Sequence, residues 1–481
     1  MRFDPDKYAC INAAGMRAHA GNSRLSESVI DAMNRAARSF VYFPDFLHAA
    51  NTHVASLLDV PAAAITSGAS AALAMISEAL FSAPNPVARY AMEHDRTPIL
   101  SPALIAIPAS HRTAYDLAFD QHKVELADPT SFQDLVAISR TRNIRLVLLI
   151  GRNLETTEFS IARIRQHLGS TPKIVVDAAA QTPEQARNWL REGADAVIIS
   201  GGKTIAGPAS TAIVIGTKPM IAGLQALSTP SQGLGRPYKL SKEGIAGCVA
   251  ALEEWLADDG ITTLIRQARQ TLAVLRDSLK PVPGIEIRIS DSDAQAIPTA
   301  TIIWNMTNVP VTGAYIRRRL LLGSPPVLVN AGPTEAPWIQ IDPACVCPIK
   351  EAPVLGEALR NLFSQPVVQT PVPPHSSWEF AVEYLDGLQP GKLALHEAGA
   401  TLDHLGLRLN GTVHADPDLT TASFRHAECG RYLQFAITSC FDSEQSRGTL
   451  TSGGSLDRHQ GEPFSSQYGR YPIVLYRSKM T

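Results

Sequence analysis

Four short polar stretches of the sequence each follow an apolar run that predicts a buried strand. Each stretch contains side chains that could bind a ligand or take part in catalysis, and we call them the four groups. The first spans residues 66–70 (TSGAS), between a short apolar run at 62–65 and an Ala/Leu/Met/Ile-rich helical stretch. Backbone N–H groups at a helix start, the helix dipole and the nearby hydroxyls together favour a bound anion. Taken alone, the same residues also fit an ordinary helix N-cap with small side chains for tight packing.

The second group, at 108–115, contains His111 and Arg112. A histidine just after a strand could stack on a ring, although a surface His-Arg pair at a helix start fits the same residues. The third is Asp177, which directly follows the apolar run at 174–176. A carboxylate placed directly after a buried strand is often a ligand, and an ordinary structural role is the alternative.

The fourth group contains Lys203, four residues past an apolar run at 196–199 and directly after Gly201-Gly202. Glycine lets the backbone turn sharply and admits a bulky group nearby. A lysine in this position is poorly placed for a solvated charge, although a loop lysine at a helix start remains the alternative. Open parallel sheets bind ligands at the carboxyl ends of their strands, where all four groups are expected.

Together the four groups supply what pyridoxal phosphate needs from a protein. The phosphate needs donors, the ring needs a stacking partner, the pyridine nitrogen needs a carboxylate, and the aldehyde needs a lysine. Lys203 lies 26 positions after Asp177, the length of one helix and one strand, which predicts neighbouring places at one pocket. No G-x-G-x-x-G or G-x-x-x-x-G-K-[ST] pattern supports a nucleotide site. No H-E-x-x-H or paired C-x-x-C pattern supports a metal, and we expect none.

The elements that must position these residues predict an α/β fold. Apolar runs bounded by helix and strand breakers predict buried strands, and helical patterns separate them. Strands that are apolar throughout and alternate with helices predict a mostly parallel sheet covered on both faces. The strands are expected at 62–65, 104–107, 146–150, 174–176 and 196–199, with helices at 131–140, 161–167 and 183–192.

Changes in composition and hydrophobic pattern along the sequence predict the domain organisation. Residues 1–240 form a large domain that binds the cofactor and includes the N-terminal segment, and 241–365 form a smaller α+β domain with a long helical region at 242–280. A Pro-rich linker at 366–378 follows. Short alternating runs with Asn-Gly and Gly-Gly turns then predict a small antiparallel β domain over 379–481.

Composition narrows the class of function. The 481 residues carry a net charge of −2, which excludes the basic surface of a dedicated nucleic-acid or anionic-membrane binder. Six cysteines are too few for a disulfide scaffold of this length, and Cys345 and Cys347 are expected to be ordinary thiols. No apolar run is long enough for a membrane span, and residues 1–10 do not resemble a signal peptide. The expected compartment is the cytoplasm.

The chain resembles the selenocysteine-synthase-like branch of the aspartate-aminotransferase superfamily of pyridoxal-phosphate enzymes (fold type I). It is most similar to the subgroup that includes D-glucosaminate-6-phosphate ammonia-lyase. The likeness spans about residues 8–330, and 200–211 is its most specific part. The stretches that carry it are 11–15, 21–23, 65–72, 111–112, 176–180, 200–211, 235–239 and 242–243.

The resemblance implies roles for particular residues. Lys203 would carry the cofactor aldehyde, Asp177 would hold the pyridine nitrogen, and His111 would stack on the ring, which makes these three the candidate catalytic residues. The implied phosphate contacts are Ser67, Gly68, Ala69 and Ser200, and the candidate substrate contacts are Arg236 and Ser23. The resemblance also implies a homodimer or higher oligomer with sites at the subunit interface.

One departure from the family lies in the N-terminal segment. The family tends to have a threonine and a Gly-Gly pair there, whereas this chain has Ala18 and Gly21-Asn22. Because that segment lies near the substrate in such folds, the identity of the substrate does not transfer with the resemblance.

The expected function is that of a pyridoxal-phosphate-dependent lyase. Proton abstraction from Cα by Lys203 and β-elimination would release ammonia and a 2-oxo acid from an amino acid or amino sugar acid. Other α-carbon chemistry of the same cofactor is an alternative: aldol cleavage, racemisation, transamination or β-replacement. Selenocysteine formation on tRNA is disfavoured by the net charge. A binding protein that keeps the fold without turnover is the alternative from another class.

Overall fold

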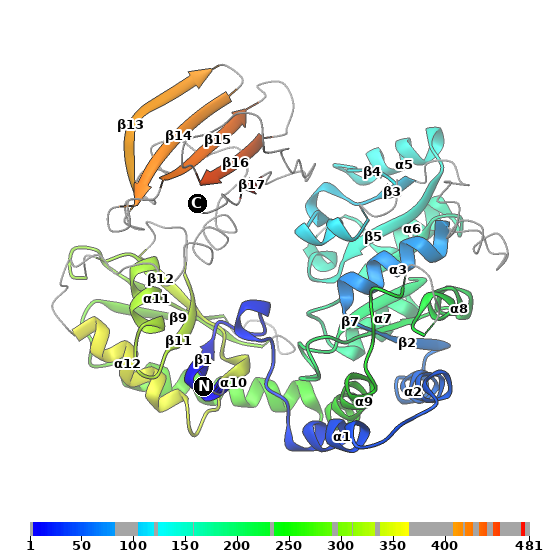
Figure 1. Cartoon of the computed structure of the whole chain (residues 1–481), viewed down its shortest axis with the longest axis horizontal. Helices are drawn as coiled ribbons and strands as arrows, with labels where there is room; N and C mark the ends of the chain where they lie inside the picture. The colour runs from blue at the N-terminus through cyan, green and yellow to red at the C-terminus, as the bar shows by residue number, and fades with distance from the viewer. Residues whose placement is uncertain are drawn as a thin grey trace. The chain divides into compact units, whose positions relative to one another are not determined.

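The structure of the chain is a computed structural model. It describes residues 3–81, 104–119, 124–156, 158–230, 235–290, 297–309, 311–331 and 337–364, and the strands at 407–416, 419–426, 432–439, 446–452 and 473–476. The chain divides into two compact units (Figure 1). We call Gly15–Leu264 the central unit and Met1–Ala14 with Ile265–Thr481 the flanking unit.

A seven-stranded sheet forms the middle of the central unit, in the order β2-β8-β7-β6-β5-β3-β4. All neighbouring strands are parallel except β8, which runs antiparallel to both β2 and β7. The mostly parallel sheet predicted from the sequence is therefore confirmed. Its strands are β2 (Ala62–Thr66), β3 (Leu104–Ala106), β4 (Glu125–Ala127), β5 (Ile144–Ile150), β6 (Lys173–Asp177), β7 (Ala196–Ser200) and β8 (Ala212–Gly216).

Helices cover both faces of this sheet, which explains why its strands are apolar throughout. In β6, Ile174 and Val176 face one core and Val175 faces the other, as the two-residue period of a strand requires. The first core also receives α1 (Glu27–Ala37), α2 (Phe43–Leu57), α5 (Phe132–Thr141), α6 (Ile161–Leu168), α7 (Pro183–Arg191) and α9 (Lys242–Ala257), and the second receives α3 (Ala69–Phe81) and α8 (Lys218–Leu227).

The helical region predicted at 242–280 is two helices, α9 and α10 (Gly260–Leu279). They are separated at Asp258 and Asp259, and Asp259 has a left-handed φ of 48°. Because Ile245 and Leu252 of α9 are buried in the core of the large sheet, the central unit extends to Leu264 and not to the predicted boundary at 240.

The flanking unit contains a second sheet in the order β1-β11-β12-β10-β9. Strand β1 pairs in parallel with β11, so residues 11–14 belong to this sheet and not to the large domain where the sequence placed the N-terminal segment. Buried side chains of this sheet share one core with α11 (Gly313–Leu321) and α12 (Ala352–Ser364). The strands are β1 (Ile11–Ala13), β9 (Ile285–Ser290), β10 (Thr299–Trp304), β11 (Val327–Ala331) and β12 (Trp338–Ile341).

Five further strands pair in sequence order β13 to β17. All pairs are antiparallel except the last, β16 with β17. The predicted linker at 366–378 lies outside the described residues, and the separate β domain at 379–481 stays a prediction. The strands are β13 (Leu407–Asp416), β14 (Leu419–His426), β15 (Tyr432–Ser439), β16 (Ser446–Ser452) and β17 (Ile473–Tyr476).

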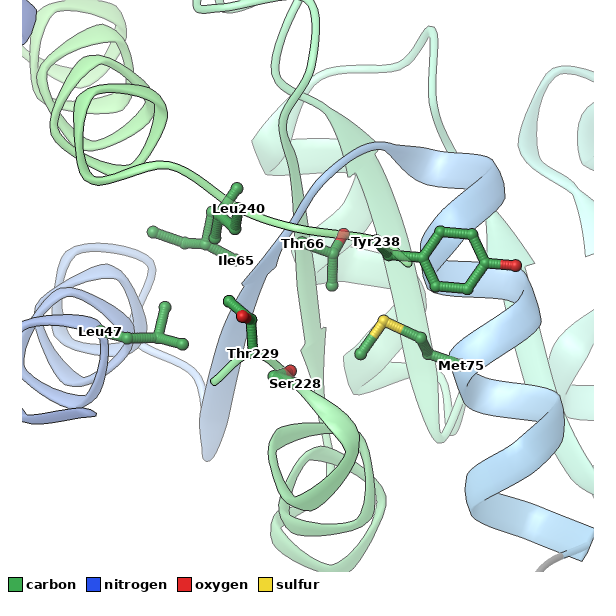
Figure 2. Close-up of a pocket in the computed structure, with 8 residues that line it drawn as sticks. All are labelled: Leu47, Ile65, Thr66, Met75, Ser228, Thr229, Tyr238 and Leu240. Carbon is green, nitrogen blue, oxygen red and sulfur yellow. The ribbon is translucent and has the colours of Figure 1, made fainter. Parts of the chain in front are cut away.

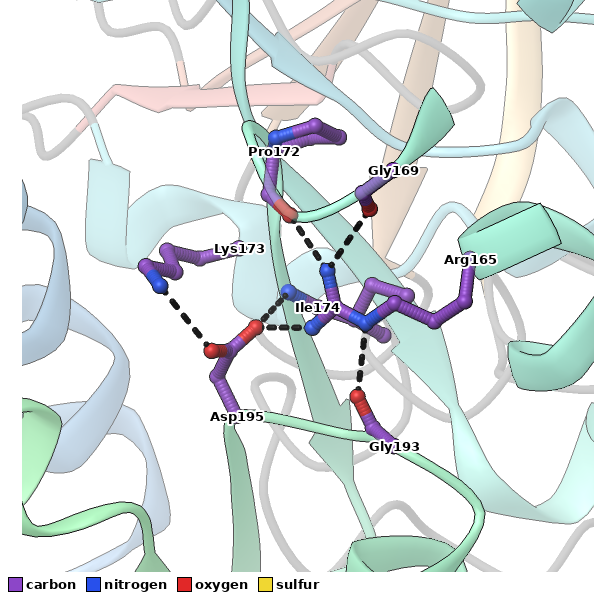
Figure 3. A network of polar contacts seen from close by, with 7 residues as sticks. All are labelled: Arg165, Gly169, Pro172, Lys173, Ile174, Gly193 and Asp195. Carbon is purple, nitrogen blue, oxygen red and sulfur yellow. Dashed lines mark hydrogen bonds and ion pairs between the residues drawn. The ribbon is translucent and has the colours of Figure 1, made fainter. Parts of the chain in front are cut away.

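A buried carboxylate fastens the amino ends of β6 and β7 (Figure 3). Asp195 accepts hydrogen bonds from the Arg165 guanidinium, from Lys173 Nζ at 3.1 Å and from the Ile174 N–H at 2.9 Å. Arg165 Nε also donates to the Gly193 carbonyl at 2.8 Å. Every polar group of this network therefore has partners, at the edge of the sheet opposite the carboxyl ends of the parallel strands.

We expect Asp195→Ala to lower the free energy of unfolding by about 3 kcal/mol, because it leaves the Arg165 charge without its partner. The matched control is Asp59→Asn, which keeps a residue that tolerates the left-handed φ of 51° at this position; the Asp59 side chain is 84% exposed and its ion pair with Arg191 spans 3.5 Å. That change should cost under ~1 kcal/mol. Urea denaturation of both variants checks the prediction, and equal losses would contradict it.

Candidate functional site

The carboxyl ends of the parallel strands bring the predicted site residues to one edge of the sheet. Thr66 at the end of β2 pairs with Ala212 of β8, which pairs with Ser200 at the end of β7. In the same way Asp177 at the end of β6 pairs with Ile198 and Ile150. Since adjacent strands lie about 4.8 Å apart, the ends of β2 and β7 are separated by roughly 10 Å.

Lys203 lies in a loop that doubles back on itself directly after β7. A Cβ at Gly201 would lie 2.0 Å from Thr211 Oγ1, and one at Gly202 would lie 2.5 Å from Ala209 Cα. The Gly201 N–H donates to the Thr211 carbonyl at 2.9 Å, which closes the loop. The sequence suggested that the two glycines admit a bulky group, but the structure shows that the returning chain itself requires them.

The electrostatic surroundings of Lys203 favour its neutral amine. Burial lowers the pKa of Lys203, and the positive charges of Arg152 and Arg17 lower it further, while Asp177 opposes them. In the described part of the chain no carboxylate forms a salt bridge with this lysine. A lowered pKa increases the neutral fraction of an amine at a given pH, and the neutral amine is the form that attacks carbonyl groups.

Asp177 is a buried carboxylate that accepts one hydrogen bond from the part of the chain that the structure describes. Its side chain lies at the end of β6, 8% of the residue is exposed, and Oδ1 accepts from the Ala179 N–H at 3.0 Å. Burial raises the pKa of Asp177, and the Ala179 N–H and the charges of Lys203 and Arg152 oppose that rise. An ionised carboxylate can accept about four hydrogen bonds, so this group has capacity for a further donor.

His111 lies in a short 3-10 helix after β3 and is held against β5 as a neutral ring. The Ile150 N–H donates to His111 Nδ1 at 2.8 Å, which places the proton of the neutral ring on Nε2. Burial lowers the pKa of His111 to about 4, and Phe159 packs edge-on with ring centroids 6.1 Å apart. Because this ring is fully covered, stacking on a ligand would require a neighbouring group to move, and that role stays a prediction.

Arg112 is buried and fixes the loop that carries His111. Arg112 Nε donates to Asp116 Oδ2 at 2.5 Å, and Arg112 also pairs with Asp128. Asp116 is 1% exposed and accepts from the Thr113 N–H at 3.2 Å. The alternative of a surface His-Arg pair is therefore wrong, because both side chains are inside the fold.

The turn between β2 and α3 is open at its glycine. Gly68 has φ +135°, a conformation that only glycine adopts without strain, and among the described residues no atom apart from its chain neighbours lies within 4 Å of the place a Cβ would take. Ser67 and Ala69 flank it at the start of the 13-residue helix α3. The open space in front of a helix start suits a phosphate or carboxylate.

The two predicted substrate contacts have protein partners. Arg236 Nη1 donates to Thr229 Oγ1 at 3.2 Å, and Ser23 Oγ donates to the Gly202 carbonyl at 3.1 Å. Thr229 borders a small pocket on the β2 side of the sheet (Figure 2). The residues that line the pocket are Leu47, Ile65, Thr66, Met75, Ser228, Thr229, Tyr238 and Leu240.

The sequence analysis missed two cations near the site. Arg152 follows Ile150 of β5 by two residues, and its charge acts on both Asp177 and Lys203. The signal that singled out Asp177, a polar residue just after a buried strand, would also have found Arg152. Arg17 acts on Lys203 from the N-terminal segment, and no local pattern marks it.

Two features of the described residues bear on metal binding and on membrane insertion. Within the described residues, no group of three or more His, Cys, Asp and Glu side chains could hold a metal ion. None of the helices in that part of the chain combines the length and apolar character needed to cross a membrane.

Comparisons with known proteins identify the fold. No protein-family model matches the chain. A solved structure of D-glucosaminate-6-phosphate ammonia-lyase superposes with a TM-score of 0.63 at 22% identity, over 75% of this chain and 97% of that one. The chain therefore has the fold of that enzyme, which is the fold that the sequence resemblance implied.

Two curated proteins are similar in sequence. A 5'-C-glycyluridine monooxygenase-decarboxylase from a Streptomyces species is 22% identical over 360 residues, which cover 72% of this chain and 88% of that protein. A D-glucosaminate-6-phosphate ammonia lyase from Salmonella typhimurium is 35% identical over 121 residues, which cover 25% of this chain and 30% of that protein. Both relatives are enzymes, and the narrower match has the higher identity.

We expect the burial of His111 to make the chain less stable in weak acid. The folded pKa of about 4 lies below the ordinary value of 6.5, so the unfolded chain binds more protons between these values. The contribution of His111 to the free energy of unfolding is complete above pH 6.5, falls by roughly 2 kcal/mol from pH 7 to pH 5, and is lost further toward pH 4.

Denaturant titrations of wild type and His111→Gln at pH 7 and pH 5 isolate this contribution. Glutamine can still accept from the Ile150 N–H but does not titrate, so the variant should lose less stability on acidification. Parallel losses in the two proteins would show that His111 does not titrate in this way.

Proposed function

We propose that the chain binds pyridoxal phosphate and acts as a lyase that releases ammonia and a 2-oxo acid from an amino acid or amino sugar acid. The observation that carries the proposal is the pair Lys203 and Asp177. They follow adjacent parallel strands, both are partly or fully buried, and no side chain neutralises either by direct contact in the described residues. A buried amine and a buried carboxylate held in this way suit an aldehyde and a basic ring nitrogen.

The residues at this edge of the sheet fit the cofactor. Lys203 would bind the aldehyde, and Asp177 would accept from the protonated pyridine nitrogen through its remaining acceptor positions. The space in front of Gly68, with Ser67, Ala69 and Ser200 beside it, would take the phosphate. His111 would lie against the ring. When bound, pyridoxal phosphate supplies an electron sink for negative charge that develops at the substrate Cα.

The chain's own groups then have defined tasks in the proposed reaction. Once the substrate amine has replaced it at the aldehyde, the free amine of Lys203 would take the proton from the substrate Cα. Asp177 would favour a protonated pyridine nitrogen. Arg152 and Arg236 are the cations available for anionic groups of the substrate. The leaving group at Cβ would depart with the electron pair of its bond, which leaves a double bond between Cα and Cβ. After a proton adds to Cβ, water would hydrolyse the resulting imine, so that ammonia and a 2-oxo acid are the products.

The ammonia lyase similarity supports this choice of reaction. The 121 matched residues are the most similar stretch among the two curated relatives, and the fold agrees over 75% of the chain. By that likeness an amino sugar acid with a phosphate is one substrate class to test. Membership of the selenocysteine-synthase-like branch, a homodimer and a cytoplasmic location belong to the same proposal and rest on the resemblance.

A second candidate is oxidative decarboxylation of an amino acid. It is favoured by the Streptomyces relative, whose match covers 72% of this chain against 25% for the curated ammonia lyase. In this case carbon dioxide and not a proton would leave Cα, and molecular oxygen would be the oxidant. Oxygen uptake with release of carbon dioxide, in place of anaerobic release of ammonia with a 2-oxo acid, identifies this candidate.

The lyase proposal is tested by screening amino acids and amino sugar acids, including D-glucosaminate 6-phosphate, for anaerobic release of ammonia and a 2-oxo acid. We expect at least one active substrate in the wild type. Lys203→Arg should abolish turnover, because a guanidinium is not a base at neutral pH. Asp177→Asn should retain the cofactor but lower kcat by about 100-fold or more.

The matched control is Asp59→Asn, which removes an exposed carboxylate from the same unit and should leave kcat unchanged. A wild type that does not bind pyridoxal phosphate would refute the proposal. An Asp177→Asn enzyme as fast as the wild type would remove the role given to Asp177.

A further inference from the structure

A serine from the N-terminal segment is bonded to the peptide that precedes Lys203. Ser23 Oγ donates to the Gly202 carbonyl at 3.1 Å, although the two residues are 179 positions apart in the sequence. Gly202 is buried and cannot carry a side chain, because a Cβ would lie 2.5 Å from Ala209 Cα. Its carbonyl is therefore a group through which the surrounding structure can hold this peptide.

The turn that presents Ser23 is itself fixed. The Asn22 N–H donates to the Arg17 carbonyl at 2.9 Å, and the Gly21 N–H donates to the Ala18 carbonyl at 3.1 Å. Gly21 and Asn22 both have left-handed φ values, +80° and +66°. Asparagine tolerates this conformation better than other residues with a side chain, so Asn22 preserves the turn where the family tends to have a second glycine.

The peptide after Lys203 is held in a similar way. Thr204 is buried, and its Oγ1 donates to the Ala180 carbonyl at 3.3 Å. Ala180 follows Asp177 by three residues. One hydroxyl therefore holds the backbone on each side of Lys203, and the second of them links the lysine loop to the segment that carries the aspartate.

We propose that Ser23 is a positioning residue for Lys203, which it holds through the Gly202 carbonyl. The sequence analysis expected Ser23 to contact substrate, but a hydroxyl has one proton to donate, and the Gly202 carbonyl takes it. The inference rests on the proposed function of Lys203 as the reactive amine. Loss of the hydroxyl would leave a buried carbonyl without this donor and let the lysine loop relax toward solvent.

The test measures the reactivity of Lys203 in the chain without cofactor. Acetic anhydride modifies neutral amines, and peptide mass spectrometry gives the rate at residue 203 as a function of pH. The plateau at high pH reports access to the amine, and the midpoint reports its basicity. In Ser23→Ala we expect the midpoint to lie at a higher pH than in the wild type. The ratio of the rate at pH 7 to the plateau rate should be about three- to tenfold lower than the same ratio in the wild type.

Two further variants separate positioning from general loosening. Ser23→Thr keeps the hydroxyl and should restore the wild-type midpoint. Ser139→Ala removes a half-buried serine hydroxyl that donates to the Val136 carbonyl at 2.7 Å on α5, and it should not move the midpoint. Ser23→Cys, a smaller perturbation with a weak donor, serves where Ser23→Ala does not fold, and its midpoint should also rise.

The inference is overturned if the midpoint in Ser23→Ala or Ser23→Cys equals that of the wild type, or if Ser139→Ala shifts it equally. Because this readout uses no cofactor, it is independent of the proposed function. If the wild type does not bind pyridoxal phosphate, the lyase proposal is refuted. The pH dependence of Lys203 modification still decides the role of Ser23 in that case.

Discussion

Asp177 is buried and Lys203 is partly buried at the carboxyl ends of adjacent parallel strands, and neither forms an ion pair within the described residues. The proposed site depends on this constraint. Burial lowers the pKa of the lysine and raises that of the aspartate, so each charge is costly in this place. Perturbed groups of this kind cluster at functional sites, which is why the proposal places a ligand here. The close approach of the returning chain at Gly201 and Gly202 and the hydrogen bond from Ser23 to the Gly202 carbonyl constrain the backbone before the lysine.

The two ends of strands β6 and β7 differ in how many hydrogen-bond and ion-pair partners their buried carboxylate has. At the amino ends of β6 and β7, Asp195 is satisfied by Arg165, Lys173 and a backbone N–H, which stabilises the fold. At the carboxyl ends, the one hydrogen bond of the Asp177 side chain among the described residues comes from the Ala179 N–H. The same pair of strands thus carries a structural carboxylate at one end and, in the proposed function, a cofactor-binding one at the other, where open parallel sheets bind ligands.

The sequence predicted the parts of this fold that depend on local pattern. Strands such as β5 and β6 are apolar on both faces and bounded by breakers. Asp177 ends β6, and Lys203 lies three residues after the end of β7. Strand β8 was missed because no helix separates it from β7, and the short strands β1 and β4 were missed as well. The hydrogen bond between Ser23 and Gly202 joins residues 179 positions apart, so no local pattern could reveal it. The reason for the two glycines, close approach of the returning chain, also required coordinates.

The central claim is tested most directly by locating the residue that binds the cofactor aldehyde. The protein is mixed with pyridoxal phosphate, reduced with borohydride and digested, and the modified peptide is identified by mass spectrometry. The account predicts one pyridoxyl group per chain, on Lys203. A label on another lysine, or one spread over several surface lysines with Lys203 unmodified, would contradict it.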